Sequence, residues 1–115
     1  MGKNYLSLEL GGKERILKFN LRALKILKEQ SGDDPFAFTL AGDLDEQFKK
    51  LSWILYAGLL SNAISQKQEP DFTIADCLYW AEEFDMSEAT ALAKAFGDAY
   101  KSDDASGEGS ADTQQ

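Results

Sequence analysis

Two short runs near the start of the chain alternate between hydrophobic and polar residues. Residues 5–10 form the first run, residues 15–19 form the second, and Gly11-Gly12-Lys13 lies between them. Alternation is typical of a strand with one buried face, and glycine adopts the positive φ angles of a tight turn at little cost. We therefore predict a β-hairpin. Each strand has one hydrophobic face, so the sheet needs a helix packed against it.

After Asn20 the hydrophobic spacing changes to that of an amphipathic helix. Asn20 is a good N-cap, and the segment 31–35 ends the helix because glycine accepts the left-handed cap and proline disfavours helix in the residue before it. We predict a helix of about three turns over residues 21–30. Its hydrophobic side contains Ala23, Leu24, Ile26 and Leu27, and its polar side contains Arg22, Lys25, Lys28 and Glu29.

A longer hydrophobic pattern begins near Asp43 and ends before Pro70. Large apolar residues recur at positions 44, 48, 51, 55 and 59, three or four residues apart, which is typical of a helix. The C-terminal half of this helix is apolar nearly all round, so we expect a central helix that other elements cover. Its apolar run of residues 51–64 is shorter than the roughly twenty residues that span a bilayer, which favours a core helix over a membrane anchor.

Two further amphipathic helices follow. Thr73 is expected to cap the third helix, and Asp76 in its first turn is stabilised by the positive end of the helix dipole. Ser87 is expected to cap the fourth helix. In the third helix the apolar residues are Ile74, Cys77, Leu78 and Ala81. In the fourth, Leu92, Ala95, Phe96, Ala99 and Tyr100 share one face.

The segment after Lys101 has a different composition. Residues 102–115 contain no large apolar side chain to offset the entropy of ordering, so we predict a disordered acidic tail. Residues 1–101 are the size of one ordinary domain. The expected fold class is mainly α within α+β: an N-terminal β-hairpin, about four helices and the tail.

The net charge argues against nucleic acid as a partner. Twenty acidic residues against twelve basic ones give −8, which repels a phosphate backbone, and the tail contributes half of that charge with four acids and no base. A basic strip is present on the first helix. The favoured interpretation is a solvated face, and contact with an acidic partner segment stays an alternative. The strip consists of Lys18, Arg22, Lys25 and Lys28.

The candidates for chemistry are few. The chain has no histidine, which removes the usual triads, most catalytic zinc sites and the near-neutral proton shuttle. The single cysteine, Cys77, makes no internal disulfide and lies on an apolar helix side, so we predict a buried thiol in a reducing cytoplasm. Gly11-Gly12-Lys13 lies between two strands, unlike a phosphate-binding loop.

Acidic clusters occur at two places. They lie at residues 43–46 and 82–85, and solvated helix faces and termini explain them more simply than a metal site or an acid–base pair. We therefore predict no metal, no cofactor and no catalytic activity; the chain is expected to work by binding another protein. Loss of a defined turnover when Glu82, Glu83 and Asp85 are changed to amides would favour an enzyme instead.

Aromatic residues gather on the last two helices. A small domain cannot easily bury all of them, and together they could leave an apolar patch that binds a partner helix or forms an oligomer contact. For each one taken singly, core packing is the favoured interpretation. The predicted protein-binding residues are Trp80, Phe84, Phe96 and Tyr100.

Several segments, taken in order, resemble the tail assembly chaperones of long-tailed bacteriophages and prophages. The Gly11-Gly12-Lys13 turn and the strand to Phe19 resemble the start of that family, and the similarity extends over residues 5–100. The other similar segments are residues 21–25 (LRALK), the central-helix segment 55–59 (LYAGL) and the threonine-capped helix start 72–76 (FTIAD).

This resemblance implies a specific partner. Such a chaperone binds the long, aggregation-prone tape measure protein, keeps it soluble and helps recruit tail tube subunits around it. It implies a protein of the bacterial host cytoplasm that is absent from the mature virion. A homo-oligomer stays open as a further partner. In many relatives a programmed frameshift adds a second domain to a minority of chains. No residue-level binding motif of the family can be placed on this chain.

Two other classes of function stay open. One is a small acidic phage-encoded inhibitor that mimics nucleic acid, which would bind a host enzyme in a salt-sensitive manner. The other is a structural virion subunit, which would be found in finished particles.

Overall fold

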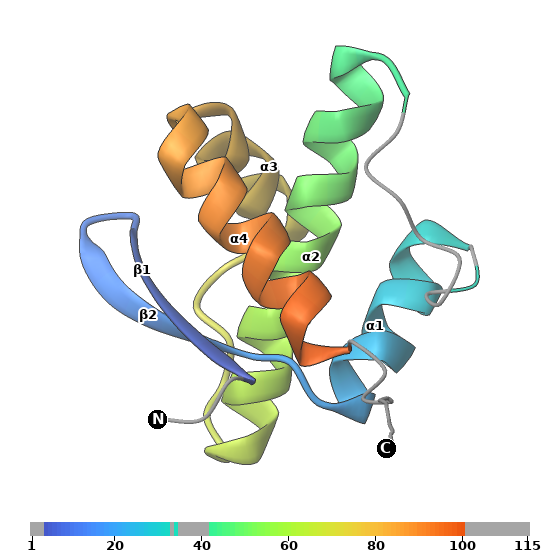
Figure 1. Ribbon diagram of the computed structural model, residues 1–115. Helices are drawn as coiled ribbons and strands as arrows, with labels where there is room; N and C mark the ends of the chain where they lie inside the picture. Colours follow the sequence, from blue (N-terminus) through green and yellow to red (C-terminus); the bar gives the residue numbers. More distant parts are fainter. Residues whose placement is uncertain (1–3, 33, 35–41, 101–115) are drawn as a thin grey trace, which may run out of the picture.

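A computed structural model describes residues 4–32, 34 and 42–100. Within these residues the chain forms an N-terminal antiparallel hairpin followed by four helices, as the hydrophobic pattern predicts (Figure 1). The predicted disordered tail, residues 102–115, lies outside the described residues. The elements are β1 (Tyr5–Leu10), β2 (Lys13–Lys18), α1 (Leu21–Ser31), α2 (Leu44–Ser65), α3 (Ile74–Glu82) and α4 (Met86–Ala99).

The hairpin closes through a two-residue turn. Gly11 and Gly12 have φ angles of 64° and 84°, which glycine adopts without steric cost. Lys13 belongs to β2, where it pairs with Leu10, so the turn is one residue shorter than the sequence indicated. Leu6 pairs with Leu17, and this register gathers the leucines of β1 and β2 on one face.

The predicted starts of three helices are confirmed, and the predicted start of the fourth is corrected. Asn20, Asp43 and Thr73 cap α1, α2 and α3, each accepting from a backbone N–H in the first turn. The prediction of Ser87 as the cap of α4 is wrong: Asp85 Oδ1 accepts from Glu88 N at 2.8 Å, and Glu88 Oε1 accepts from Asp85 N at 3.0 Å. Asp85 caps the helix in place of Ser87 because Glu88, three residues after Asp85, completes a capping box.

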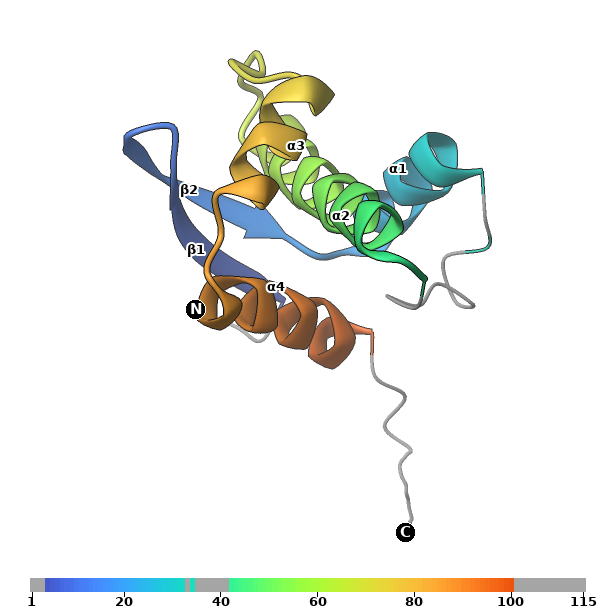
Figure 2. The same ribbon diagram turned by 90° about the horizontal axis from the view of Figure 1, so that it is seen from above.

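The central position predicted for α2 is confirmed. Its middle and C-terminal turns are buried by α1, α3 and the hairpin, and Leu55 is fully covered. In the view of Figure 2, α1, α2 and α3 form one group and α4 lies below them as a separate layer. No helix within the described residues is long and apolar enough to cross a membrane.

The hairpin approaches α2 most closely at Gly58. A Cβ atom at this position would lie 2.8 Å from Leu17 Cβ and 2.9 Å from Phe19 Cε1, so only glycine fits. Polar groups join the same region, because Ser61 Oγ donates to Asn20 Oδ1 at 2.6 Å. The cap of α1 is thereby tied to α2. The core therefore centres on the contact of β2 with α2.

Candidate functional site: an apolar groove between helices

The four predicted protein-binding residues fall into two pairs: Trp80 and Phe84 line one hollow, whereas Phe96 and Tyr100 pack against Phe19. Trp80 lies on the hairpin turn, where a Cβ added to Gly11 would meet its Cζ2 atom at 2.8 Å. Arg15 Cζ lies 4.9 Å from the centroid of the Trp80 ring, a cation–π distance. Trp80 is half-buried between these partners. Its contacts join α3 to the hairpin and leave little of the ring for a client.

Arg15 extends this junction to the loop before α3. Its Nε donates to the Leu10 carbonyl at 2.9 Å, and its Nη1 lies 2.7 Å from Asp71 Oδ1. Lys13 Nζ lies 2.6 Å from the other carboxylate oxygen. The hydrogen bonds from Arg15 and then from Lys13 hold the pKa of Asp71 well below its usual range. The Arg15 side chain is only 11% exposed, so these contacts fasten the hairpin to the helices.

Phe96 and Tyr100 attach the C-terminal end of α4 to Phe19 and Asn20. The Phe96 ring lies edge-on to Phe19, with centroids 5.8 Å apart, and 5.2 Å from the ring of Tyr100. The Tyr100 hydroxyl donates to the Asn20 carbonyl at 2.5 Å, and burial raises its pKa. These contacts give both residues a packing role. Their predicted role in client binding stays a prediction.

Phe84 also lines a second hollow, which is an apolar groove. The groove has a volume of about 470 Å³ and lies between the N-terminal half of α2, the end of α3 with the loop that follows, and the first turns of α4. We call it the apolar groove and define it by its main hydrophobic lining residues. These are Leu44, Phe48, Leu51, Phe84, Met86 and Ala89.

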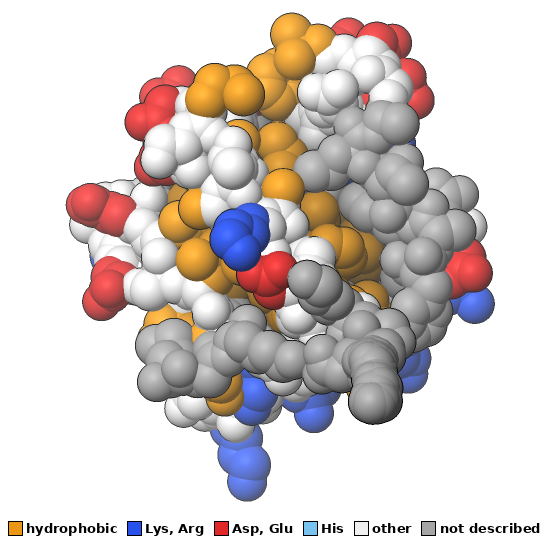
Figure 3. Space-filling view, viewed as in Figure 1, with side chains coloured by type: hydrophobic (Ala, Val, Ile, Leu, Met, Phe, Trp, Pro, Cys, Tyr) orange, Lys and Arg blue, Asp and Glu red, His pale blue; other side chains and the backbone are white. Residues whose placement is uncertain are grey.

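The edges of the apolar groove are unusually exposed for hydrophobic side chains. Leu44 is 64% exposed and Met86 is 80% exposed, and each is the first residue of its helix. In Figure 3 hydrophobic side chains form a strip from the top of the molecule down its middle. A contiguous exposed patch of this kind marks a protein-interaction or ligand site more often than scattered single residues do.

Sequence reasoning missed Leu44 and Met86 because it looked for aromatic residues. A usable signal was present: each follows an aspartate that opens a capping box, Asp43 with Glu46 and Asp85 with Glu88. A residue at the first helical position lies at the rim of its helix, where only a neighbouring element can cover it. Leu44 and Met86 differ from Leu21, another exposed first residue, because both line the same hollow, and this shared location points to a partner.

Acidic residues border the apolar groove. Glu82 and Asp85 line it, and Asp45 stands in the first turn of α2. The described lining residues include no lysine or arginine. The nearest cation along α4, Lys94, is paired with Asp98 at 2.8 Å. The groove is therefore apolar in the middle and negative on its α3–α4 side.

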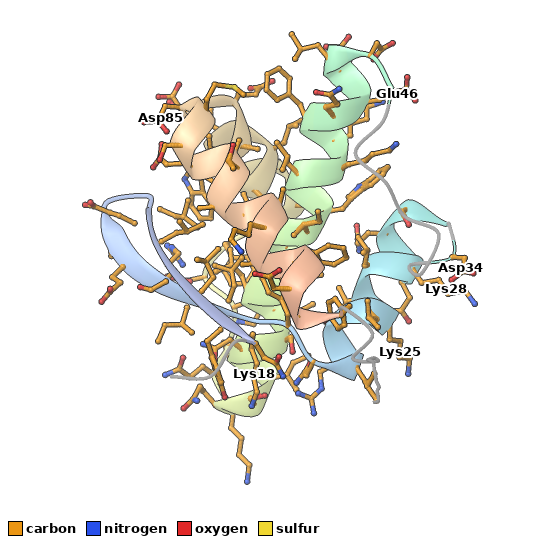
Figure 4. The ribbon with its side chains drawn as sticks, in the orientation of Figure 1. Lys18, Lys25, Lys28, Asp34, Glu46 and Asp85 are labelled. Atoms are coloured by element: carbon orange, nitrogen blue, oxygen red, sulfur yellow. The ribbon has the colours of Figure 1, made fainter. Side chains whose placement is uncertain are left out.

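Several charged residues of the described part of the chain lie at opposite ends of the molecule. Figure 4 places Glu46 and Asp85 at one end, and Lys18, Lys25 and Lys28 toward the other. In the basic strip, Arg22 Nη1 donates to Ser65 Oγ at 3.0 Å and Lys18 Nζ lies 5.5 Å from the Tyr5 ring centroid. The interpretation of the strip as a solvated face stays a prediction.

The residues weighed for chemistry have structural explanations. Cys77 is fully buried, and burial, with a smaller effect of the Asp76 charge, raises its pKa to about 12, which disfavours a reactive thiolate. Asp43 and Asp85 cap helices, as the interpretation of the acidic clusters as helix termini predicted. Within the described ranges, no cluster of three or more cysteine, aspartate or glutamate side chains could hold a metal ion.

Comparison with protein-family models, curated proteins and solved structures finds no significant match to this chain.

Proposed function

We propose that this chain is a non-catalytic binding protein that covers a hydrophobic segment of a client protein in the apolar groove. The observation that carries the proposal is the exposure of Leu44 and Met86 at the edges of a hollow lined by Phe48, Leu51 and Phe84. Such a surface costs free energy when it faces water, and a partner that covers it recovers that free energy.

The proposed client is the tape measure protein of a long-tailed bacteriophage or prophage. This identity comes from the resemblance of residues 5–100 to tail assembly chaperones. The chain would hold the client in the cytoplasm of the host cell, help recruit tail tube subunits and be absent from the mature virion. A hydrophobic groove suits this task because it can mask a long apolar helix until assembly.

The test is co-expression with the tape measure protein encoded nearby, followed by pull-down and an assay of client solubility. The informative variant is Leu44→Glu combined with Met86→Glu, which puts charge on both edges of the groove. Both positions are exposed, and each is the first residue of a helix, where the positive end of the helix dipole stabilises a glutamate. The double variant should therefore still fold. We expect client binding to weaken by at least about tenfold.

Leu21→Glu is the matched control. Leu21 is also the first residue of a helix, is 78% exposed and lies on α1, which contributes no lining residue to the groove. It should bind the client as well as the unaltered chain does. Equal client binding by all the variants would refute the groove as the client site. A chain found in purified virions would instead indicate a structural subunit.

A further inference from the structure

We propose that the apolar groove takes a single amphipathic α-helix of the client, with lysine or arginine residues along the side of its hydrophobic stripe that meets Glu82 and Asp85. This inference rests on the proposed function and specifies the chemistry of the segment that is bound. Three features of the groove carry it: the elements that line it, the apolar surface beyond the hollow, and the sign of the charges on its α3–α4 side.

The lining elements favour a helical occupant. The groove is walled by α2, α4 and the end of α3, whose backbone groups bond within their own helices. The first turns of α2 and α4 are closed by the capping boxes of Asp43 and Asp85. An extended segment would find no strand edge among these elements to pair with. The occupant therefore has to satisfy its own backbone hydrogen bonds, as a helix does.

The extent of the apolar surface favours a segment of protein over a small molecule. A compact ligand could fill the hollow of about 470 Å³. It would leave Leu44 and Met86 uncovered, because these side chains stand at the edges with 64% and 80% of their surface exposed. A helix that lies along the groove covers the hollow with one apolar row and both edges with the neighbouring rows.

The charges on one side of the groove favour a basic flank. Glu82 and Asp85 line the groove on the α3–α4 side. A helix with lysine or arginine along this side places opposite charges beside these carboxylates, whereas an acidic flank would be repelled. Lys94, whose ammonium group is paired with Asp98, does not change the sign of the charge beside Glu82 and Asp85.

A second copy of this chain fits less well. A symmetric contact of groove with groove would bring like charges together, Glu82 and Asp85 facing the same residues of the partner. The basic helix α1 would supply the right charges, but its apolar residues Leu24 and Leu27 are already buried in its own fold. Neither surface offers a free apolar stripe with a basic border.

Synthetic peptides test the inference. The probe is a labelled peptide of about 18 residues with leucines at helical spacing and lysines along one border of the stripe. A second peptide has glutamate in place of each lysine, and a third has proline at its centre. Fluorescence anisotropy with the full chain should show that the lysine peptide binds about tenfold more tightly than the glutamate peptide at low salt, and only a few-fold more tightly at high salt.

Charge reversal on the protein provides the matched controls. Glu82→Lys, which reverses the charge of a lining acid, should weaken or abolish the preference for the lysine peptide. Glu69→Lys, an exposed acid beyond the far end of α2, makes one such charge change away from the groove and should preserve the preference. The proline peptide should not bind, because proline breaks the helix.

Each opposing result has a distinct meaning. Equal binding of the lysine and glutamate peptides, or binding of the proline peptide, would overturn the inference. So would a dimer of the chain that Leu44→Glu dissociates, because the occupant would then be a second copy. If no peptide binds but the whole client binds in a manner that depends on Leu44 and Met86, the inference fails and the proposed function stands. If the client ignores both residues, the proposed function itself fails.

Discussion

The hairpin side of the molecule and the groove side treat their large hydrophobic residues differently. On the hairpin side, Trp80 has Arg15 and Gly11 as partners, and Tyr100 has Asn20. On the groove side, Leu44 and Met86 are mostly exposed. Three of the four predicted binding residues, Trp80, Phe96 and Tyr100, are thus engaged in packing, while Phe84 lines the groove at whose edges Leu44 and Met86 are exposed. A partner is indicated by what stays exposed.

The largest expected effect is on the hairpin side. Phe96→Ala should lower the free energy of unfolding by about 2–3 kcal/mol, less than a fully buried phenylalanine costs, because the ring packs edge-on to Phe19 and is half-buried. Urea unfolding measures the loss. Phe84→Ala is the comparison: it should cost about 1 kcal/mol and weaken client binding instead. If Phe84→Ala costs more stability than Phe96→Ala, the distinction between the two sides is wrong.

The next effect concerns two helical glycines that differ in their surroundings. Gly58→Ala places a Cβ 2.8 Å from Leu17 Cβ, and the resulting overpacking should outweigh the gain in helix propensity. We expect a net loss of about 1–2 kcal/mol. Gly97→Ala meets nothing within 4 Å and should gain about 0.5–1 kcal/mol. Thermal unfolding of both variants should show shifts of opposite sign; shifts of the same sign would contradict the packing of β2 on α2.

The smallest effect is the pH dependence of the Asp71 contacts. Arg15 and Lys13 depress the pKa of Asp71 in the folded state, so its contribution is fully present above the ordinary value of 3.8 and is lost as the pH falls below it. Asp71→Asn should therefore be less stable than the unaltered chain at pH 6, and the difference should shrink in acid. Urea unfolding at several pH values checks this. A difference that is constant with pH would exclude the ion pair as its cause.

Most of the fold could be predicted from the chain because its signals are local. The two strands follow from alternation, and the starts of α1, α2 and α3 follow from capping residues that act within one helical turn. The error at Ser87 was also local, since Asp85 has Glu88 three residues later and Ser87 has Thr90. A search for the complete capping box finds the observed start of α4.

The candidate site could not be predicted in the same way because its contacts are long-range. Trp80 lies against Gly11 and Tyr100 donates to Asn20, and no local pattern announces pairs so far apart in the chain. Helical spacing placed Phe84 and Phe96 on amphipathic helices, but only the three-dimensional arrangement puts the former in the groove and the latter against Phe19. The tape measure protein as the partner stays a prediction.

Amide hydrogen exchange of the chain, free and bound to the tape measure protein, tests the central claim most directly. We expect binding of the client to slow amide exchange in residues 44–51 and 84–93, which border the apolar groove, and to leave exchange in the hairpin turn at Gly11 and Gly12 unchanged. Slower exchange confined to the hairpin or to α1, with none around the groove, would contradict it.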